Sequence, residues 1–282
     1  MLVTAVATCS LGLGLASATG TAIASGAPNP GGLPILAGSP HAGLPTIALN
    51  WSGYAASSNT GKAFTYVHAE FTEPTLTCSG KPNQWTSNWV GLDGFTDQTV
   101  EQDGTFAWCG GKDNMRQFYY AWYEMYPAGA VIVFAVHPGN LIDASVRYVS
   151  SHFVLSVSDL STGMSASKSA TCSSTTCVRD SAEWIIERPA LCNNSFTKCF
   201  LTALANFGTT TMQSAVAKTA GSPAQELAGF AGLSQIFMVQ NTKDGGFYTL
   251  DAPCAVDALT QSFPVKFLHH GTTVPIQLGT NK

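Results

Sequence analysis

Short alternating or β-branched runs, separated by Gly, Asn, Asp and Ser, fill the chain from Ile47 to the C-terminus. Runs of this kind are typical of strands, and helix signals are almost absent between them. Without helical crossovers, so many strands in one domain must pair as antiparallel sheets that pack face to face. The sequence therefore predicts an all-β fold, a two-sheet antiparallel β-sandwich of the concanavalin A-like or jelly-roll type.

The expected strands can be placed individually, and one short helix is expected at Pro223–Leu233. The strands are expected at Ile47–Ala55, Phe64–Thr72, Ser87–Leu92, Thr99–Gln102, Gln117–Tyr126, Val131–Val136, Asp143–Val149, Phe153–Val157, Ser165–Ala170, Ala182–Glu187, Ala205–Phe207, Thr209–Val216, Ile236–Gln240, Phe247–Leu250 and Thr260–Phe267.

The composition restricts the partners that the chain can bind. Charged residues make up 11% of the 282 residues, against a usual share of about 25%. With 13 Lys+Arg, 17 Asp+Glu and no basic run, the chain lacks the positive footprint that nucleic acids or anionic membranes require. A low carboxylate count also suits an acidic, extracellular setting, because few groups destabilise the fold when they are protonated. We expect one domain and a monomer.

The N-terminal region differs from the rest in composition. Residues Met1–Ala24 form an apolar run of small residues that ends in small-x-small sites, which is typical of a secretory signal peptide, although a basic start is missing. Residues Ser25–Pro45 are rich in Gly, Pro and Ala with almost no charge, and they predict a disordered leader or propeptide. Order is expected from Thr46, with the sandwich over 46–282, and the protein is expected to be secreted.

Seven cysteines remain after the predicted signal, which suggests disulfides with one thiol left over. Proximity in the sequence favours Cys78–Cys109, Cys172–Cys177 and Cys192–Cys199, and it leaves Cys254 as the expected free thiol. No Cys-x-x-Cys or paired-His spacing is present. We therefore expect neither a metal site nor a cofactor.

The stretch Gln117–Pro127, QFYYAWYEMYP, is the most distinctive in the chain. Side chains alternate between the faces of a strand, so Trp122, Glu124 and Tyr126 share one face. A carboxylate between two rings loses solvation and must be paired, hydrogen-bonded or used in chemistry. Glu124 is therefore a candidate for a functional site.

Three further stretches add polar groups to the expected sheet faces. In WVGLDG, Trp89 and Asp93 share a face; in VEQDG, Gln102 faces away from Glu101; in AEWIIE, Glu183 and Glu187 share a face. Each residue has an ordinary interpretation when taken alone, such as pairing of Glu187 with Arg188. Their occurrence together with tryptophans instead favours an aromatic groove for acid-base work on an extended polymer, which could be peptide or sugar.

Common catalytic signatures are missing, including Gly-x-Ser-x-Gly, His-Glu-x-x-His and phosphate loops. The residues alone leave two other classes open. A sandwich glycosidase would use a carboxyl pair such as Glu183/Glu187 or Glu124/Glu187. A non-catalytic carbohydrate- or peptide-binding module would use the aromatic face without turnover. An amide partner such as Gln102 argues against the glycosidase.

Six ordered motifs closely resemble those of the glutamic peptidases, or eqolisins. They are NWSGYA at Asn50–Ala55, WVGLDG at Trp89–Gly94, VEQDG at Val100–Gly104, YYAWYEMYP at Tyr119–Pro127, AEWIIE at Ala182–Glu187 and ANFG at Ala205–Gly208.

The resemblance implies a β-sandwich whose concave face binds a polypeptide, which a Gln and Glu dyad hydrolyses through water. Carried over by motif, the catalytic dyad is Gln102 and Glu187. The supporting residues are Asp93, Glu124 and Trp89, and the substrate-binding residues are Trp51, Trp122 and Tyr126. The sequence departs from the family pattern at Met125, where a second Trp is frequent, and it lacks the Asp that follows the catalytic Gln in fungal members.

The proposed chemistry is also reasonable without the family. A carboxylate can deprotonate water, and an amide N–H can donate to the oxyanion that forms. A carboxylate base, with an ordinary pKa of about 4.3, remains usable in acid, where a histidine would be protonated. The sequence therefore predicts a secreted endopeptidase that acts in acid.

Overall fold

The computed structural model describes residues 29–37, 41–58, 60–172, 177–193 and 198–276. Strands dominate these residues, and the single helical segment among them is the 3₁₀ turn η1, Leu227–Gly229, within the helix expected at Pro223–Leu233. No helix in the described ranges is long and apolar enough to cross a membrane. The predicted signal Met1–Ala24 lies outside the described residues.

The strands coincide with most of the expected runs. They are β1 Asn29–Gly31, β2 Thr46–Ala48, β3 Trp51–Ser57, β4 Phe64–Thr72, β5 Gln84–Leu92, β6 Val100–Gly110, β7 Arg116–Tyr126, β8 Val131–Ala135, β9 Leu141–Val149, β10 His152–Asp159, β11 Met164–Ala170, β12 Ser181–Glu187, β13 Ala190–Cys192, β14 Cys199–Leu201, β15 Ala203–Leu204, β16 Thr209–Thr219, β17 Gln225–Glu226, β18 Leu233–Asn241, β19 Phe247–Pro253, β20 Phe263–Phe267 and β21 Val274–Ile276. The strand expected at Ala205–Phe207 is absent from these described residues, which form only an isolated bridge from Asn206 to Thr77.

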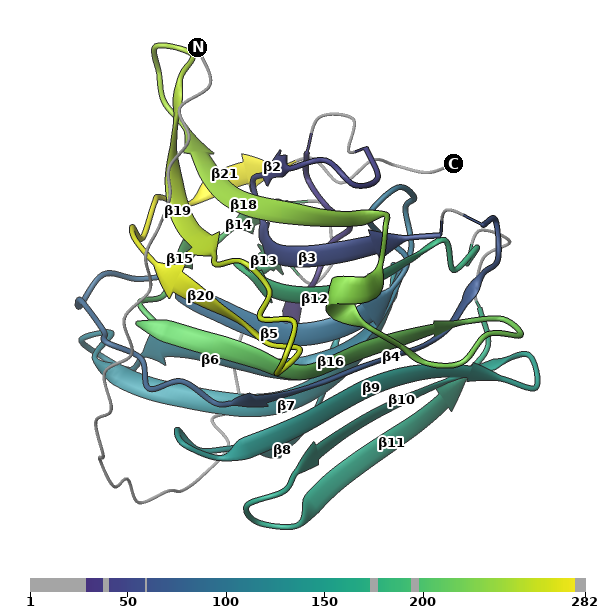
Figure 1. Cartoon of the computed structure of the whole chain (residues 1–282). Helices are drawn as coiled ribbons and strands as arrows, with labels where there is room; N and C mark the ends of the chain where they lie inside the picture. Colours follow the sequence, from purple (N-terminus) through teal and green to yellow (C-terminus); the bar gives the residue numbers. More distant parts are fainter. Residues whose placement is uncertain (1–28, 38–40, 59, 173–176, 194–197, 277–282) are drawn as a thin grey trace.

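Antiparallel pairing links the strands in the order β11-β10-β9-β4-β16-β20-β19-β18-β3-β12-β5-β6-β7-β8. Figure 1 shows β4, β9, β10 and β11 as one layer across the lower part of the molecule. Strands β3, β12 and β5 belong to the second layer, which is drawn above it. The predicted two-sheet β-sandwich is therefore confirmed.

The sheet formed by β3, β12, β5, β6 and β7 buries apolar side chains on both of its faces. Trp184 and Ile186 point into the large core between the two sheets. Ile185, on the same strand, points the other way into a second cluster that contains Trp51, Trp89 and other aromatic residues. Strand alternation predicts this division, and the second cluster forms the floor of the candidate site.

Gly104 allows two strands of this floor to approach closely. In the strand register it lies between Trp89 on β5 and Trp122 on β7. A Cβ atom at this position would come within 2.0 Å of the Asn88 carbonyl oxygen and 2.7 Å of the Trp89 Cβ. Only glycine therefore permits this close approach of β5 and β6.

The three expected disulfides, Cys78–Cys109, Cys172–Cys177 and Cys192–Cys199, are present. The expectation of a free thiol at Cys254 is wrong, because Cys254 is also disulfide-bonded. The expectation rested on an odd count after removal of the predicted signal. Such a count does not show which cysteines lie close together in the fold.

A small second sheet, in the order β1-β13-β14-β21, lies apart from the strand order of the sandwich. Its first strand, β1, belongs to the stretch Ser25–Pro45 that was expected to be disordered. Gly32, Leu33 and Pro34 are buried, and Ile35 donates its N–H to the Gly94 carbonyl at 2.9 Å. For residues 29–37 the prediction of disorder, and of an ordered start at Thr46, is therefore wrong: a Gly/Pro-rich segment becomes ordered when a sheet supplies its hydrogen bonds.

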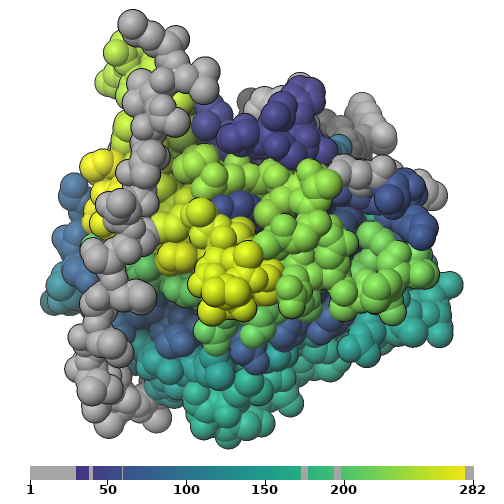
Figure 2. Space-filling model, in the orientation of Figure 1, coloured from purple at the N-terminus to yellow at the C-terminus, as the bar shows by residue number. Residues whose placement is uncertain are grey.

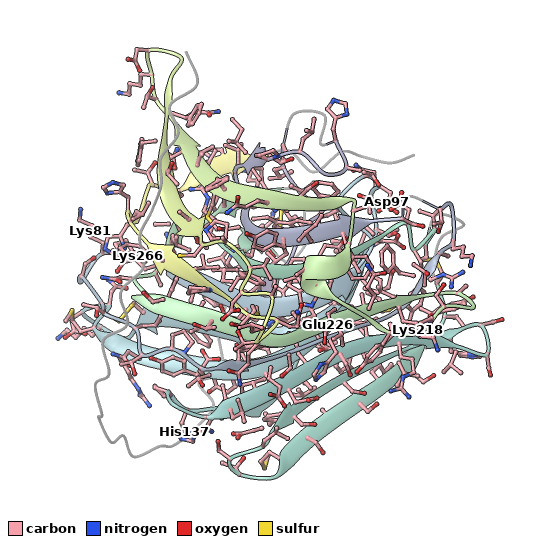
Figure 3. The ribbon with its side chains drawn as sticks, viewed as in Figure 1. Lys81, Asp97, His137, Lys218, Glu226 and Lys266 are labelled. Atoms are coloured by element: carbon pink, nitrogen blue, oxygen red, sulfur yellow. A yellow bond between two sulfur atoms is a disulfide. The ribbon has the colours of Figure 1, made fainter. Side chains whose placement is uncertain are left out.

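The lysines among the described residues are all exposed, whereas nine carboxylates are buried. Figure 3 shows Lys81 and Lys266 at the left edge of the molecule, and these two residues, like Lys218 and Glu226, are exposed. In the space-filling view, residues of the purple N-terminal part pack directly against the green strands from later in the chain. Figure 2 thus shows N-terminal residues as part of the packed body of the protein.

Candidate active site

Glu187, the last residue of β12, is completely buried. Its Oε2 accepts a hydrogen bond from the Trp89 Nε1 at 2.9 Å, and its Oε1 accepts from the Asn50 Nδ2 at 3.3 Å. Arg188 does not pair with it, since the Arg188 Nη1 donates to the Gln240 Oε1 and the Thr272 carbonyl. The ordinary interpretation of Glu187 as half of a surface ion pair is thereby excluded.

Gln102 and Glu124 lie directly opposite each other on β6 and β7. The Gln102 Nε2 donates to the Glu124 Oε2 at 2.8 Å, and both residues are buried. Because an amide nitrogen has two hydrogens, one remains available to a further acceptor. Glu124 therefore fixes the orientation of the Gln102 amide.

The segment Gly32–Leu33 joins the two halves of this arrangement. The Gly32 N–H donates to the Glu124 Oε2 at 2.9 Å, and the Leu33 N–H donates to the Glu187 Oε1 at 3.2 Å. A Cβ atom on Gly32 would lie 2.3 Å from the Gln102 Nε2. An extended peptide thus runs between Gln102 and Glu187, although the motifs that contain these two residues are far apart in the sequence.

Burial dominates the electrostatics of the two carboxyl groups. It raises the pKa of Glu187 to about 8, against smaller lowering effects of the Leu33, Asn50 and Trp89 hydrogen bonds. Burial also raises the pKa of Glu124 well above its ordinary value, and the charge of Glu187 raises it further. Two neighbouring buried carboxyl groups do not ionise together easily, so Glu124 keeps its proton in acid.

The expected substrate-binding aromatics lie on the same face. Trp51 and Trp89 pack edge to face with ring centroids 5.0 Å apart, and Trp122 stacks on Phe106 at 4.4 Å. Tyr126 is partly buried and contacts the apolar cluster that contains Leu33. These rings form the wall and floor around the peptide segment.

The structure does not bring Asp93 to the other candidates. Its Oδ1 accepts the Asp180 N–H at 3.0 Å, and within the described ranges no hydrogen bond joins it to Gln102, Glu124 or Glu187. Burial and the charge of Asp97 raise its pKa to about 8. Oxygen atoms of Asp93, Asp97 and Asp180 lie within 4.8 Å of one another, which is close enough for a cation, but protons would compete for Asp93 in acid.

Glu183, one candidate for a glycosidase pair, lies apart from the peptide segment. It is completely buried, and neither carboxyl oxygen has a hydrogen-bond partner among the described residues. Burial raises its pKa well above the ordinary value, with Asp93 and Asp97 among its charged neighbours. Glu187, and not Glu183, forms a hydrogen bond with the Gly32–Leu33 segment.

Asn50 is the residue of this site that the sequence analysis did not identify. Its Nδ2 donates to the Pro34 carbonyl at 3.2 Å, and its Oδ1 accepts the Leu36 N–H at 2.7 Å, in addition to its contact with Glu187. The residue was quoted within the NWSGYA motif, directly before Trp51. Its role depends on the bound segment, which the composition had suggested to be disordered.

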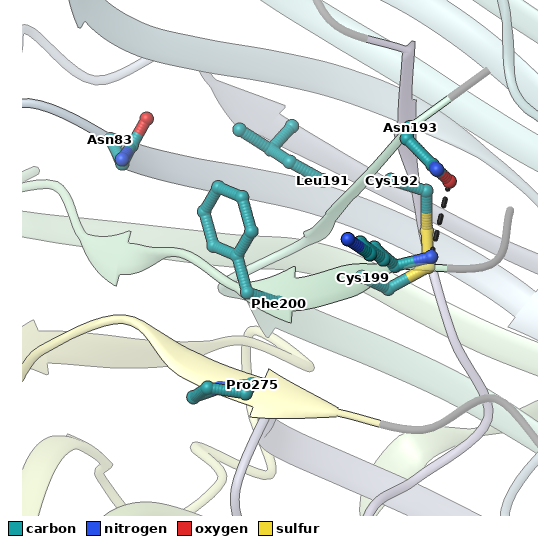
Figure 4. A pocket seen from close by; sticks show the side chains of 8 residues that line it. Asn83, Leu191, Cys192, Asn193, Cys199, Phe200 and Pro275 are labelled. Atoms are coloured by element: carbon teal, nitrogen blue, oxygen red, sulfur yellow. Dashed lines mark hydrogen bonds between the residues drawn. A yellow bond between two sulfur atoms is a disulfide. The ribbon is translucent and has the colours of Figure 1, made fainter.

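A hollow of about 500 Å³ lies against β13, β14 and β21, and Figure 4 shows its lining. Pro30 of β1 pairs with Leu191 of β13, which in turn pairs with Phe200 of β14. The hollow is lined by Asn83, Leu191, Cys192, Asn193, Lys198, Cys199, Phe200 and Pro275. Strand β13 therefore both pairs with β1 and lines this hollow.

A model of the peptidase A4 family matches residues 49–252 of this chain, which is well over half of its length. The chain belongs to the peptidase A4 family. The resemblance to the glutamic peptidases that the six motifs indicated is thereby confirmed. In this A4 family member the matched region contains Gln102, Glu124 and Glu187, whereas the segment Asn29–Leu36 lies outside it.

Known relatives of this A4 family member agree in sequence and in fold. Scytalidopepsin B of Scytalidium lignicola is 32% identical over 166 residues, which are 57% of this chain and 60% of that protein. The crystal structure of scytalido-glutamic peptidase with a transition state analog inhibitor is similar with a TM-score of 0.63 and 22% identity, over 78% of this chain and 98% of that one. Its structure with a peptide based transition state analog gives a TM-score of 0.64 and 24% identity with the same coverage.

Proposed function

We propose that this A4 family member is a glutamic endopeptidase that hydrolyses polypeptides in acid through Gln102 and Glu187. The observation that carries the proposal is the position of the Gly32–Leu33 peptide, which has the Gln102 amide on one side and the Glu187 carboxyl on the other. Amide hydrolysis requires a general base near the nitrogen of the peptide bond and a hydrogen-bond donor near its carbonyl. Glu187 lies at the Leu33 nitrogen, and the Gln102 amide lies beside Gly32. The names of the relatives, scytalidopepsin B and scytalido-glutamic peptidase, support the same activity.

In the proposed mechanism, Glu187 removes a proton from a water molecule that attacks the carbonyl carbon of the substrate. The free N–H of Gln102 donates to the oxyanion that forms. Glu187 then returns the proton to the leaving nitrogen, and the carbon–nitrogen bond breaks. The products are a carboxylic acid and an amine, so that the elements of one water molecule are added across the peptide bond.

Glu124 and the aromatic residues have supporting roles in this proposal. Glu124 orients the Gln102 amide through the hydrogen bond at 2.8 Å. Trp89 stabilises the charged form of Glu187 by donating its Nε1–H. Trp51, Trp122 and Tyr126 line the site for an extended chain, whereas Asp93, which interacts with Asp97 and Asp180, has no direct part in this proposal.

We further propose that the enzyme is a secreted monomer. The three disulfides among the described residues are typical of an oxidising compartment. The apolar stretch Met1–Ala24 supports export.

The purified chain is expected to fragment an unfolded protein in acid and to leave polysaccharides intact. Incubation across acidic pH, followed by mass spectrometry of the products, checks this expectation. The Glu187→Gln variant serves as the matched control and should release no fragments. Cleavage of a polysaccharide with no peptide products would instead support the glycosidase interpretation.

Replacement of Trp89 by Phe is expected to shift the acid limb of the pH–rate profile to higher pH. The variant loses the N–H that stabilises ionised Glu187, and so the pKa of Glu187 rises, by about one unit because a hydrogen bond to a charged group contributes about 1.5–3 kcal/mol. Measurement of kcat/KM against pH tests this. Trp85→Phe is the control, since Trp85 is buried in the same cluster and stacks on Trp108. Equal shifts in both variants would contradict the assignment.

A further inference from the structure

The segment Asn29–Leu36 is tied to the candidate site by backbone hydrogen bonds along its length. Its first part forms β1 and pairs antiparallel with β13, with Gly31 opposite Ala190. Further along, Gly32 contacts Glu124 and Leu33 contacts Glu187, while Asn50 binds the segment at Pro34 and Leu36. Addition of an extended peptide to an existing strand is a common mode of peptide recognition.

The position of Gly32 excludes a side chain. A Cβ atom there would meet the Gln102 Nε2 at 2.3 Å and its Cδ and Oε1 at 2.9 Å. Gln102 is buried, and movement away from Gly32 would break its hydrogen bond with Glu124. The site therefore accepts glycine at this position far better than any larger residue.

The next position accepts a large aliphatic side chain. Leu33 is only 2% exposed and packs with Ala190 and Leu201 in a separate apolar cluster. Partly buried Tyr126, Val274 and others complete this cluster. A charged side chain at the position of Leu33 would lose its solvation without gaining a partner there.

We propose that residues 29–33 occupy the substrate-binding cleft of their own chain in the manner of a substrate, and that they mark its preference for extended, uncharged peptides with glycine beside Gln102 and a large aliphatic residue directly after it. This proposal rests on the proposed function. The Leu33 N–H donates a hydrogen bond to Glu187, and the Leu33 nitrogen therefore lies where we expect the leaving nitrogen of a substrate. The preferred bond is thus the one between glycine and the aliphatic residue, and β13 pairs with the residues before the glycine, as it does with β1.

The same occupancy explains the burial of the catalytic candidates. Glu187 is completely buried while the segment covers it, and burial is the largest cause of its raised pKa. Departure of the segment would admit water and return this pKa toward the ordinary value of about 4.3. In acid, Glu187 is therefore ionised, and able to act as a general base, more often when the cleft is free than when the segment occupies it.

The first arm of the test compares the initial rates at which full-length chains hydrolyse an added peptide in acid. Gly32→Val and Leu33→Arg should displace the segment and raise the rate about tenfold or more, because the competent fraction of the enzyme increases. Leu44→Arg is the control, since Leu44 is 56% exposed, and it should match wild type. Mass spectrometry at the start of each reaction verifies that the N-terminal segment is still attached.

The second arm measures binding, which needs no turnover. A Leu33→Arg chain that also carries Glu187→Gln, so that the peptide is not cleaved, is titrated by calorimetry with the synthetic peptide Asn-Pro-Gly-Gly-Leu-Pro-Ile-Leu, which corresponds to residues 29–36. Versions with Val in place of the second Gly, or Arg in place of the first Leu, should bind about tenfold more weakly or worse.

The outcomes of the two arms separate the inference from the proposed function. Equal rates for wild type, Gly32→Val and Leu33→Arg, or equal binding of the three peptides, would overturn the inference and leave the peptidase activity standing. If no variant hydrolyses any peptide but the glycine peptide binds more tightly than its Val version, the proposed peptidase function is wrong. The inference that residues 29–33 occupy the cleft is then still supported.

Discussion

Glu187→Gln is expected to lower kcat by several orders of magnitude while the melting temperature remains near that of wild type. The substitution keeps the shape of the side chain but removes the base, and general-base catalysis contributes about 10²–10⁴-fold. Gln102→Ala is expected to lose about 3–4 kcal/mol of transition-state stabilisation, as for the loss of one oxyanion donor. Steady-state kinetics in acid, together with thermal denaturation of each variant, checks both expectations.

Glu183→Gln is the matched control for this experiment. Glu183 lies on the same strand and the same face as Glu187 and is equally buried, but it makes no contact with the segment at Gly32–Leu33. Its Gln variant should retain most of the activity. An inactive Glu183→Gln together with an active Glu187→Gln would require the dyad to be rebuilt around Glu183.

The folded protein is expected to be most stable in acid and to lose stability as the pH rises toward neutral and alkaline values. Burial raises the pKa of Glu73, Asp93 and Asp251 to about 8 and that of Glu101 to about 10. A group whose pKa is higher in the folded state than in the unfolded state binds its proton more tightly when folded. Its contribution is fully present below about pH 4 and is lost between there and the folded-state pKa.

The size of this effect is large. One pKa unit corresponds to about 1.4 kcal/mol, so a few such groups can offset the whole free energy of unfolding of a domain, about 5–15 kcal/mol. The lowered pKa values of Asp244 and Asp257 act in the opposite direction. Both carboxyls are exposed, however, and solvent screens their interactions.

Denaturant unfolding at a series of pH values tests this expectation. The midpoint should fall steadily from about pH 4 to about pH 9. Glu101→Gln should flatten this dependence, because it removes one buried ionisable group while it preserves the shape of the side chain. A midpoint that rises over the same interval would show that these carboxyls are already charged and paired in the folded protein.

Several features of the fold could be predicted because they depend on local pattern. Alternation along β12 correctly placed Trp184 and Ile186 in one core and Ile185, Glu183 and Glu187 on the other face. Alternation along β7 likewise placed Glu124 beside Trp122. Both follow from the two-residue period of a strand, which the sequence alone displays.

Other features could not be predicted because they depend on contacts between distant segments. The acid Asp93 shares a face with Trp89 by parity, but the turn at its positive φ of 71° leads its carboxyl toward Asp180 and Asp97. The disulfide state of Cys254 likewise depends on which cysteine the fold brings near it. Neither spacing nor parity contains this information.

The sequence by itself determined the β-sandwich, three of the disulfides and the family, because strand periodicity, proximity and ordered motifs are all properties of the linear chain. Only the tertiary structure decided what lies between Gln102 and Glu187. Residues 29–36 have no hydrophobic period and resemble a disordered leader in composition, since Gly and Pro offer little side chain to bury. They become ordered because β13, Asn50, Glu124 and Glu187 satisfy their backbone groups, and those partners meet only in the folded protein.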